Sequence, residues 1–141
     1  MNIIQQIIPM LAYEDGIAAM NWLCYVFGFT ENMRMTDAAD HLAHGELKMG
    51  ESLVMLAEPT SHYQSPAHHA QNCDIAAKWS AVPYIINGVL VYVDDVEQHY
   101  RTAKSKGATI LSELEYGFPG TRYRAADLEG QRWMFMQIKR D

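Results

Sequence analysis

Two segments near the end of the chain differ sharply in their pattern of apolar and polar positions. In residues 121–125 basic side chains occupy alternate positions among β-forming residues, whereas residues 132–138 are almost wholly apolar or aromatic. Between them, residues 127–130 (Asp-Leu-Glu-Gly) are typical turn residues. The pattern predicts a hairpin over residues 120–137. Its second strand is apolar on both faces, so we expect it in the middle of a sheet and covered on both sides.

The first part of the chain alternates between strand and helix patterns. Residues 3–12 predict a strand with Pro9 at an edge or bulge, because proline cannot donate to a central ladder. Apolar residues then recur at helical spacing over residues 16–27, with Asp15 as the cap and Gly28 as the stop. Further strands are predicted at residues 30–35, 41–49 and 52–57. Residues 1–58, called module one, therefore have the order β-α-β-β-β.

Residues 84–141, called module two, repeat this order. A strand over 84–93, interrupted at Asn87-Gly88, precedes a helix over 96–106 that Gly107 ends, a strand over 108–111 and the final hairpin. Landmark residues recur 79 or 80 positions apart, in the pairs Asp15 and Asp95, Gly28 and Gly107, Thr30 and Thr109, and Gly50 and Gly130. Such a period predicts a duplicated unit, here within a single domain of 141 residues.

The segment between the modules follows neither pattern. Residues 59–83, called the linker segment, include the adjacent pair His68-His69 and a predicted short helix over about 72–80, capped by Asn72 or Asp74. A connection of this length inside a compact domain is typical of a lid, a binding loop or a dimer arm. Tyr63, Trp79 and Pro83 make it our candidate for the arm at a dimer interface.

The final hairpin, with its Asp-x-x-Gly turn and Trp/Phe-containing last strand, and the duplicated β-α-β-β-β order resemble the vicinal-oxygen-chelate superfamily. Glyoxalases, bleomycin-resistance proteins and extradiol dioxygenases belong to it. The resemblance covers nearly the whole chain apart from residues 58–83. It implies an α+β fold in which the two modules pair edge to edge as an open, barrel-like half-cup that holds the ligand.

The resemblance also implies where a metal would be held, on the first and last strand of each module. These four places fall at Ile8 or Pro9, Val54 or Met55, Asn87 or Gly88, and Met134. None is a carboxylate or an imidazole, and neutral amides such as Asn87, or Gln6 after a two-residue slip, do not hold a catalytic divalent ion. We therefore expect no metal or other cofactor, and neither glyoxalase nor dioxygenase activity.

Charge limits the classes of partner. The net charge of −6 resides in residues 1–70, which hold two basic and eight acidic residues, whereas residues 71–141 hold nine of each. No basic stripe is present, so nucleic acid is not an expected partner. The acidic first half either attracts a cationic ligand or serves as a solvated surface that aids solubility.

Two further features bear on location. Cys24 and Cys73 are too few for a disulfide framework or a zinc site, which favours a reducing cytoplasm. No apolar run approaches the ~20 residues of a membrane-spanning helix, so we expect no membrane association.

A few polar residues are candidates for binding or chemistry. His44 and Glu46 lie two apart in a predicted strand and so share a face, either as an acid/base pair or as polar anchors, or simply as part of a solvated strand. Arg122 and Arg124 also share a face, for anion binding or for pairing with Asp127, Glu129 or neighbouring acids. The complete set of candidate ligand-binding residues is His44, Glu46, Tyr92, Tyr123, Arg124 and Met134.

Three functions fit these observations. The first is a metal-free protein that binds a small molecule in the cup, resembling the bleomycin-resistance branch and forming a homodimer. The second is a metal-independent isomerase or lyase acting on a small carbonyl or hydroxy compound, with His44 and Glu46 as catalytic candidates and Arg124 as an anion clamp. The third is a structural or partner-binding module.

Overall fold

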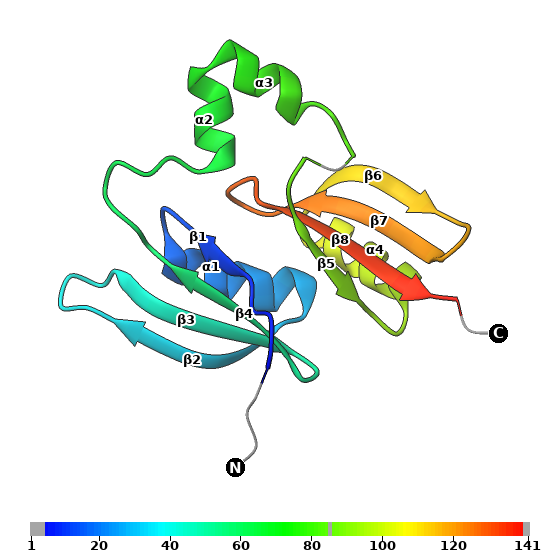
Figure 1. The fold of residues 1–141 in the computed structure, drawn as a ribbon, viewed down its shortest axis with the longest axis horizontal. Coiled ribbons are helices and arrows are strands. Elements are labelled where there is room, and N and C mark those ends of the chain that lie inside the picture. Colours follow the sequence, from blue (N-terminus) through cyan, green and yellow to red (C-terminus); the bar gives the residue numbers. More distant parts are fainter. Residues whose placement is uncertain (1–4, 85, 140–141) are drawn as a thin grey trace.

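Two four-stranded sheets, one from each module, stand beside each other in the computed structural model, which describes residues 5–84 and 86–139 (Figure 1). The strands are β1 (Met10–Ala12), β2 (Thr30–Thr36), β3 (Leu42–Met49), β4 (Ser52–Ala57), β5 (Val89–Tyr92), β6 (Thr109–Glu115), β7 (Gly120–Ala126) and β8 (Arg132–Ile138). Their orders, β1-β4-β3-β2 and β5-β8-β7-β6, are equivalent, and each sheet contains one parallel pair. The predicted α+β fold of duplicated modules is confirmed, and the sheets are not closed into a barrel.

One helical layer covers the same side of both sheets, behind them in Figure 1. In module one it consists of α1 (Gly16–Trp22), which continues as the π-helical turn η1 (Leu23–Phe27), and in module two of α4 (Val96–Ser105). The predicted cap Asp15 is confirmed, because its side chain accepts a hydrogen bond from the third residue after it, and Asp95 caps α4 in the same way. Gly28 and Gly107 follow the helices with φ of 84° and 108°, which favours glycine.

Both first strands are shorter than predicted. β1 begins at Met10, not within residues 3–9, of which 3 and 4 lie outside the described part. Pro9 contributes only its carbonyl, which accepts from Met55 N at 2.9 Å, since proline has no N–H to extend the ladder. β5 begins only at Val89, because the Asn87-Gly88 break is real and Gly88 lies so close to the Arg132 backbone that a Cβ would clash. β6, in contrast, extends four residues beyond the predicted end at 111.

The linker segment contains two helices where one was predicted, α2 (Pro66–Asn72) and α3 (Asp74–Ser80). The predicted caps were wrong: Asn72 ends α2, and Asp74 lies inside the first turn of α3. Ser65 caps α2 by accepting from His68 N at 3.2 Å, and Pro66 occupies the first helical position. The end of the segment is attached to β8 by the guanidinium of Arg132, which donates to the carbonyls of Val82 and Ser80.

Aromatic side chains fill the core where the modules meet. The ring of Phe27, at the end of η1, lies 5.8 Å from that of Trp133 and 4.7 Å from that of Phe135 between ring centroids. All three side chains are buried. Helices thus pack on only one face of β8. The opposite face, which carries Met134, borders a pocket, so the expectation that both faces would be covered was wrong.

A buried carboxylate at the β7–β8 turn joins the two modules. Asp127 Oδ2 accepts from Tyr13 Oη of module one at 2.6 Å and from Trp133 Nε1 at 3.1 Å. Its other oxygen accepts from two backbone N–H groups of its own turn. In the same turn the Glu129 carboxylate accepts from the backbone N–H groups of Glu14 and Asp15 at 2.7 and 2.9 Å. Burial raises the pKa of both carboxyls, but these donors offset much of that cost.

We expect Asp127→Ala to destabilise the protein by about 2–6 kcal/mol, because the buried donors of Tyr13 and Trp133 would each lose their acceptor at ~1–3 kcal/mol. Urea unfolding followed by tryptophan fluorescence measures the change. Glu51→Ala, at an exposed turn of module one, is the matched control and is expected to have little effect. Equal midpoints for both variants would contradict the role assigned to Asp127.

Candidate ligand-binding site

The face of the module two sheet that is turned away from the helices carries the candidate side chains of that module. Register pairs place Leu90, Met134 and Arg124 beside one another across β5, β8 and β7. Because paired residues project to the same side of a sheet, all three lie on one face, which we call the open face.

A pocket of about 210 Å³ lies on this open face around Arg124. Its surface is almost entirely apolar, and we call it the Arg124 pocket. It contains three of the positions at which the resemblance would place metal ligands, namely Asn87, Gly88 and Met134. The complete lining is Pro83, Tyr84, Asn87, Gly88, Val89, Leu90, Leu111, Arg124, Arg132, Trp133 and Met134.

Arg124 is held in place by β6. Its Nη1 donates to Glu115 at 2.9 Å and to Ser112 at 3.2 Å, while Arg122 donates to the same Glu115 carboxylate at 3.2 Å. Of the predicted partners, Asp127 and Glu129 are wrong, since both belong to the module junction, but cross-strand pairing with a neighbouring acid is confirmed, with Glu115 as that acid. Arg124 Nε is buried and has no partner among the described residues. A buried N–H without an acceptor is costly.

Tyr123 does not reach the open face. It points to the helices, is fully buried, and its hydroxyl lies 2.6 Å from Nδ1 of His99. His99 Nε2 lies 2.7 Å from the carbonyl of Phe27, so this nitrogen carries the proton and Nδ1 accepts from Tyr123. Burial lowers the pKa of His99 and raises that of Tyr123, which keeps both neutral. The alternation along β7 already separated Tyr123 from Arg124 in the sequence.

The module one candidates lie on the open face of the other sheet. His44 Nε2 donates to Glu46 Oε2 at 2.7 Å, and Asn32 Nδ2 donates to the other oxygen of Glu46 at 2.7 Å. These hydrogen bonds lower the pKa of the Glu46 carboxyl. Met33 and Met55 pair with Glu46 on neighbouring strands, so the surroundings are rich in thioethers. The structure brings the predicted pair together, but on a different sheet from the Arg124 pocket.

Tyr92, the remaining candidate, lies near the end of β5, with its side chain 58% exposed. It borders a larger pocket where β5 ends and α4 begins, and not the Arg124 pocket.

The side chains present do not fit the divalent ion of the metal-using relatives. On the open faces the equivalent strand positions pair as Met10 with Met55 and as Leu90 with Met134. Val54 faces the helices and is buried. Within residues 5–84 and 86–139, no three His, Cys, Asp or Glu side chains converge as metal ligands would. Thioethers are soft, weak ligands, so these positions do not hold a hard cation.

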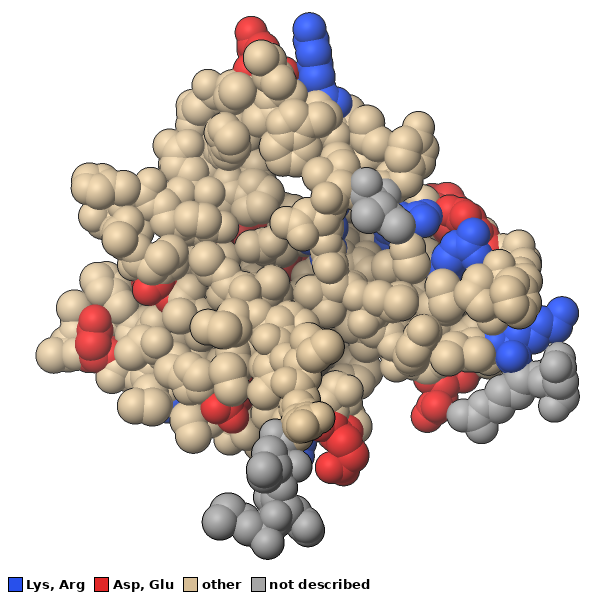
Figure 2. Space-filling view, in the orientation of Figure 1, with Lys and Arg blue, Asp and Glu red and all other residues tan. Residues whose placement is uncertain are grey.

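Charge is distributed unevenly over the visible side of the molecule. In Figure 2 the face is mostly uncharged, with scattered Asp and Glu on the module one side and most of the visible Lys and Arg over module two. The Arg124 pocket therefore lies in the more basic half of the protein.

Known proteins share this architecture. A family model of the "Glyoxalase/Bleomycin resistance protein/Dioxygenase superfamily" matches residues 4–135. The crystal structure of TioX from Micromonospora sp. ML1 is similar over 97% of this chain and 98% of its own, with 28% identity and a TM-score of 0.69. FosX, a fosfomycin resistance protein from Listeria monocytogenes, is similar over 98% and 96%, with 10% identity and a TM-score of 0.65. The comparison with curated proteins found no match.

The fold is thus that of the vicinal-oxygen-chelate proteins, as the sequence predicted. The chain belongs to the glyoxalase/bleomycin resistance protein/dioxygenase superfamily. None of the helices in the described part is long and apolar enough to cross a membrane.

We expect purified protein to carry no stoichiometric divalent metal, and a chelator to leave its melting temperature unchanged. A metal bound only to the folded state would add stability that chelation removes. Elemental analysis and thermal melts with and without EDTA test this expectation. About one Zn, Ni, Fe or Mn ion per chain, or a lower melting temperature in EDTA, would contradict the expectation that the site holds no metal.

Proposed function

We propose that the protein binds a small, largely apolar molecule in the Arg124 pocket without a metal. The observation that carries the proposal is a concave, almost entirely apolar pocket lined by two cationic side chains, Arg124 and Arg132, of which Arg132 already donates to the carbonyls of Val82 and Ser80. Ligand sites typically combine apolar walls with a few polar groups that fix orientation. Here the ligand supplies an oxygen acceptor to Arg124 and apolar surface to Leu90, Leu111 and Met134.

The size of the pocket limits how much of a ligand it encloses. Sites for drug-sized molecules usually measure roughly 300–1,000 Å³, and the Arg124 pocket is smaller. It therefore encloses only one ring or one short branch of a ligand. The rest lies along the exposed apolar surface beside it, where Tyr84 and Leu90 are about half exposed or more.

Binding is favoured over catalysis because the pocket has no group suited to moving protons. Among the described residues its lining contains no His, Asp or Glu; arginine stays protonated at all ordinary pH values, and the one hydroxyl in the lining belongs to the exposed Tyr84. The family description includes bleomycin resistance proteins, which is consistent with binding of a bioactive compound as the role. Free Cys24 and Cys73 are consistent with the reducing cytoplasm as its location.

One observation favours a second candidate, a metal-independent isomerase or lyase. His44 and Glu46 form a 2.7 Å hydrogen bond on the open face of module one, and a substrate lying across both sheets could reach this pair as well as Arg124. The exposed methionines of module one support the third candidate function, a structural or partner-binding module.

The ligand test is a thermal-shift screen against metabolites and antibiotics. A ligand at 100 times its dissociation constant stabilises by about 2.7 kcal/mol, which corresponds to roughly 5–10 °C for a domain of this size. We expect hits that carry an oxygen acceptor. Arg124→Met keeps the apolar stem but removes the charged donor, and should weaken these hits about 10- to 100-fold by calorimetry.

Arg122→Met is the matched control. Arg122 shares the sheet face and the Glu115 partner of Arg124 but does not line the pocket, so its variant should bind like wild type. Equal loss in both variants, or none in either, would show that the ligand lies elsewhere. Product formation from a hit that His44→Ala abolishes would favour the enzyme instead.

We also propose that the protein is a homodimer through the open face of module one. On module one Met10 is 81% exposed and Met35 55%, and the register places Met10, Met33 and Met55 on the side away from the helices. Exposed apolar surface of this kind marks interaction sites, and dimerisation through one shared face is the commonest way to cover it.

Light scattering at micromolar concentration should therefore give twice the mass of one chain. Met35→Lys places a charge on the proposed interface and should shift the mass towards the monomer. Tyr25→Gln, which removes an exposed aromatic ring on the helical side, should leave the mass unchanged. A monomeric wild type would refute the dimer.

A further inference from the structure

Because the modules are duplicated, contacts at the start of α1 in module one can be compared with those at the start of α4 in module two, beside the larger pocket. Where each first helix begins, the two modules have nearly the same backbone, with φ/ψ of −124°/90° at Asp15 and −136°/89° at Asp95. Equivalent contacts surround both points. Gly16 N donates to the side chain of Glu58 at 3.0 Å, and Val96 N donates to that of Gln137 at 3.1 Å.

One contact of module one has no counterpart in module two. At the start of α1, the backbone N–H groups of Glu14 and Asp15 both donate to the Glu129 carboxylate. The equivalent pair at the start of α4 belongs to Asp94 and Asp95. In the described part of the chain, no side chain or carbonyl accepts from these two N–H groups.

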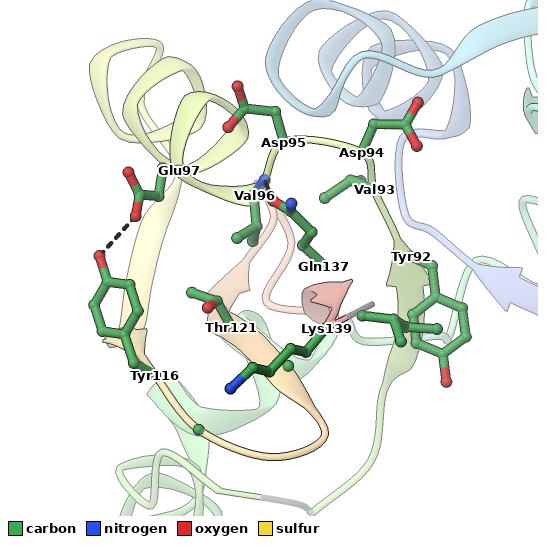
Figure 3. A pocket seen from close by; sticks show the side chains of 13 residues that line it. Tyr92, Val93, Asp94, Asp95, Val96, Glu97, Tyr116, Thr121, Gln137 and Lys139 are labelled. Atoms are coloured by element: carbon green, nitrogen blue, oxygen red, sulfur yellow. Dashed lines mark hydrogen bonds between the residues drawn. The ribbon is translucent and has the colours of Figure 1, made fainter. Parts of the chain in front are cut away.

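Asp94 and Asp95 line a pocket of about 960 Å³ (Figure 3). Thr121, Gln137 and Lys139 lie across its middle, and the carboxylates of Asp94 and Asp95 point away from that centre. Exposed aromatic rings stand on opposite sides, Tyr92 at 58% and Tyr116 at 68% exposure. The pocket thus combines two backbone donors that have no acceptor among residues 5–84 and 86–139, a cation and two aromatic flanks.

We propose that this pocket binds a carboxylate, in the way that Glu129 is bound in module one, and that its ligand is an aromatic carboxylic acid. The two N–H groups of residues 94 and 95 hold the carboxylate, Lys139 contributes its charge, and Tyr92 and Tyr116 contact the ring. This site is separate from the Arg124 pocket, with which it shares no lining residue.

The acidic side chains near the pocket do not prevent the binding of a carboxylate. Module one binds the Glu129 carboxylate although Glu14 and Asp15 supply the N–H groups, because their own carboxylates are engaged elsewhere. Glu14 accepts from Ser65 N and His68, and Asp15 caps α1. In module two Asp95 likewise caps α4, and the Asp94 carboxylate, which accepts no hydrogen bond from the described residues, points away from the centre of the pocket (Figure 3).

Glu97, the third acid of this pocket, accepts from Tyr116 Oη at 3.0 Å. The start of a helix adds a favourable partial positive charge for an anion.

The experiment titrates the full chain, labelled with ¹⁵N, with 2-naphthoate and records amide spectra. The amide protons of Asp94 and Asp95 should shift downfield in a saturable way. Those of Glu14 and Asp15 serve as internal controls and should stay in place, because Glu129 already binds them. The neutral isostere 2-naphthamide should produce no comparable shift.

Variants separate the two pockets. Lys139→Gln should weaken 2-naphthoate binding about two- to fivefold, as expected for an exposed ion pair, and Lys106→Gln at the far end of α4 should not. Arg124→Met should leave the titration unchanged, so failure of this site and failure of the proposed ligand pocket are distinguishable.

A dilution series without naphthoate identifies the source of the carboxylate. If the same two amides move with protein concentration alone, an acidic side chain of a second copy occupies the site. Absence of a saturable shift at residues 94 and 95 in both experiments, or an equal shift with 2-naphthamide, would overturn the proposal.

Discussion

The carboxylate of Asp127 is the acceptor on which the arrangement of the two modules depends. It lies in the interior and accepts from Tyr13 of module one, Trp133 of module two and two backbone groups of its own turn. A neutral or shorter side chain would leave buried donors unpaired, which is costly in a low-dielectric interior. The same turn presents Glu129 to the start of α1, so one short segment fixes how the two sheets, and their open faces, lie relative to each other.

The two modules kept the same backbone but use it differently. Both retain a capping aspartate, a glycine with positive φ after the helix and one parallel strand pair beside two antiparallel ones. Their open faces have diverged. That of module one is rich in thioethers around the His44–Glu46 pair, whereas that of module two places Arg122 and Arg124 around one glutamate. The backbone is constrained by folding, while the exposed side chains were free to change the chemistry.

The sequence predicted what local chemistry determines. Asp15, Gly28 and their partners in module two are required by helix ends, so their spacing revealed the duplication. Contacts between distant segments left no such signal in the sequence. Glu115 could be identified as the partner of both arginines only once the full length of β6 was known. The position of His99 between Phe27 and Tyr123 follows only from the packing of the two modules. Two signals were present but overlooked, the Ser65-Pro66 start of α2 and the strand alternation that turns Tyr123 inward.

In the proposed metal-free site, the side chains at the expected metal-ligand positions and the position of Arg124 are connected. A divalent ion in this fold needs three or four ligands from strands of different modules, and it is held only when all of them converge. Arginine carries its charge and its donor geometry within one side chain, and here it is oriented by Ser112 and Glu115 of the neighbouring strand alone. Recognition can therefore be completed inside module two. Under this proposal the open face of module one need not ligate a metal, so methionine at positions 10 and 55 is compatible with a functional Arg124 pocket.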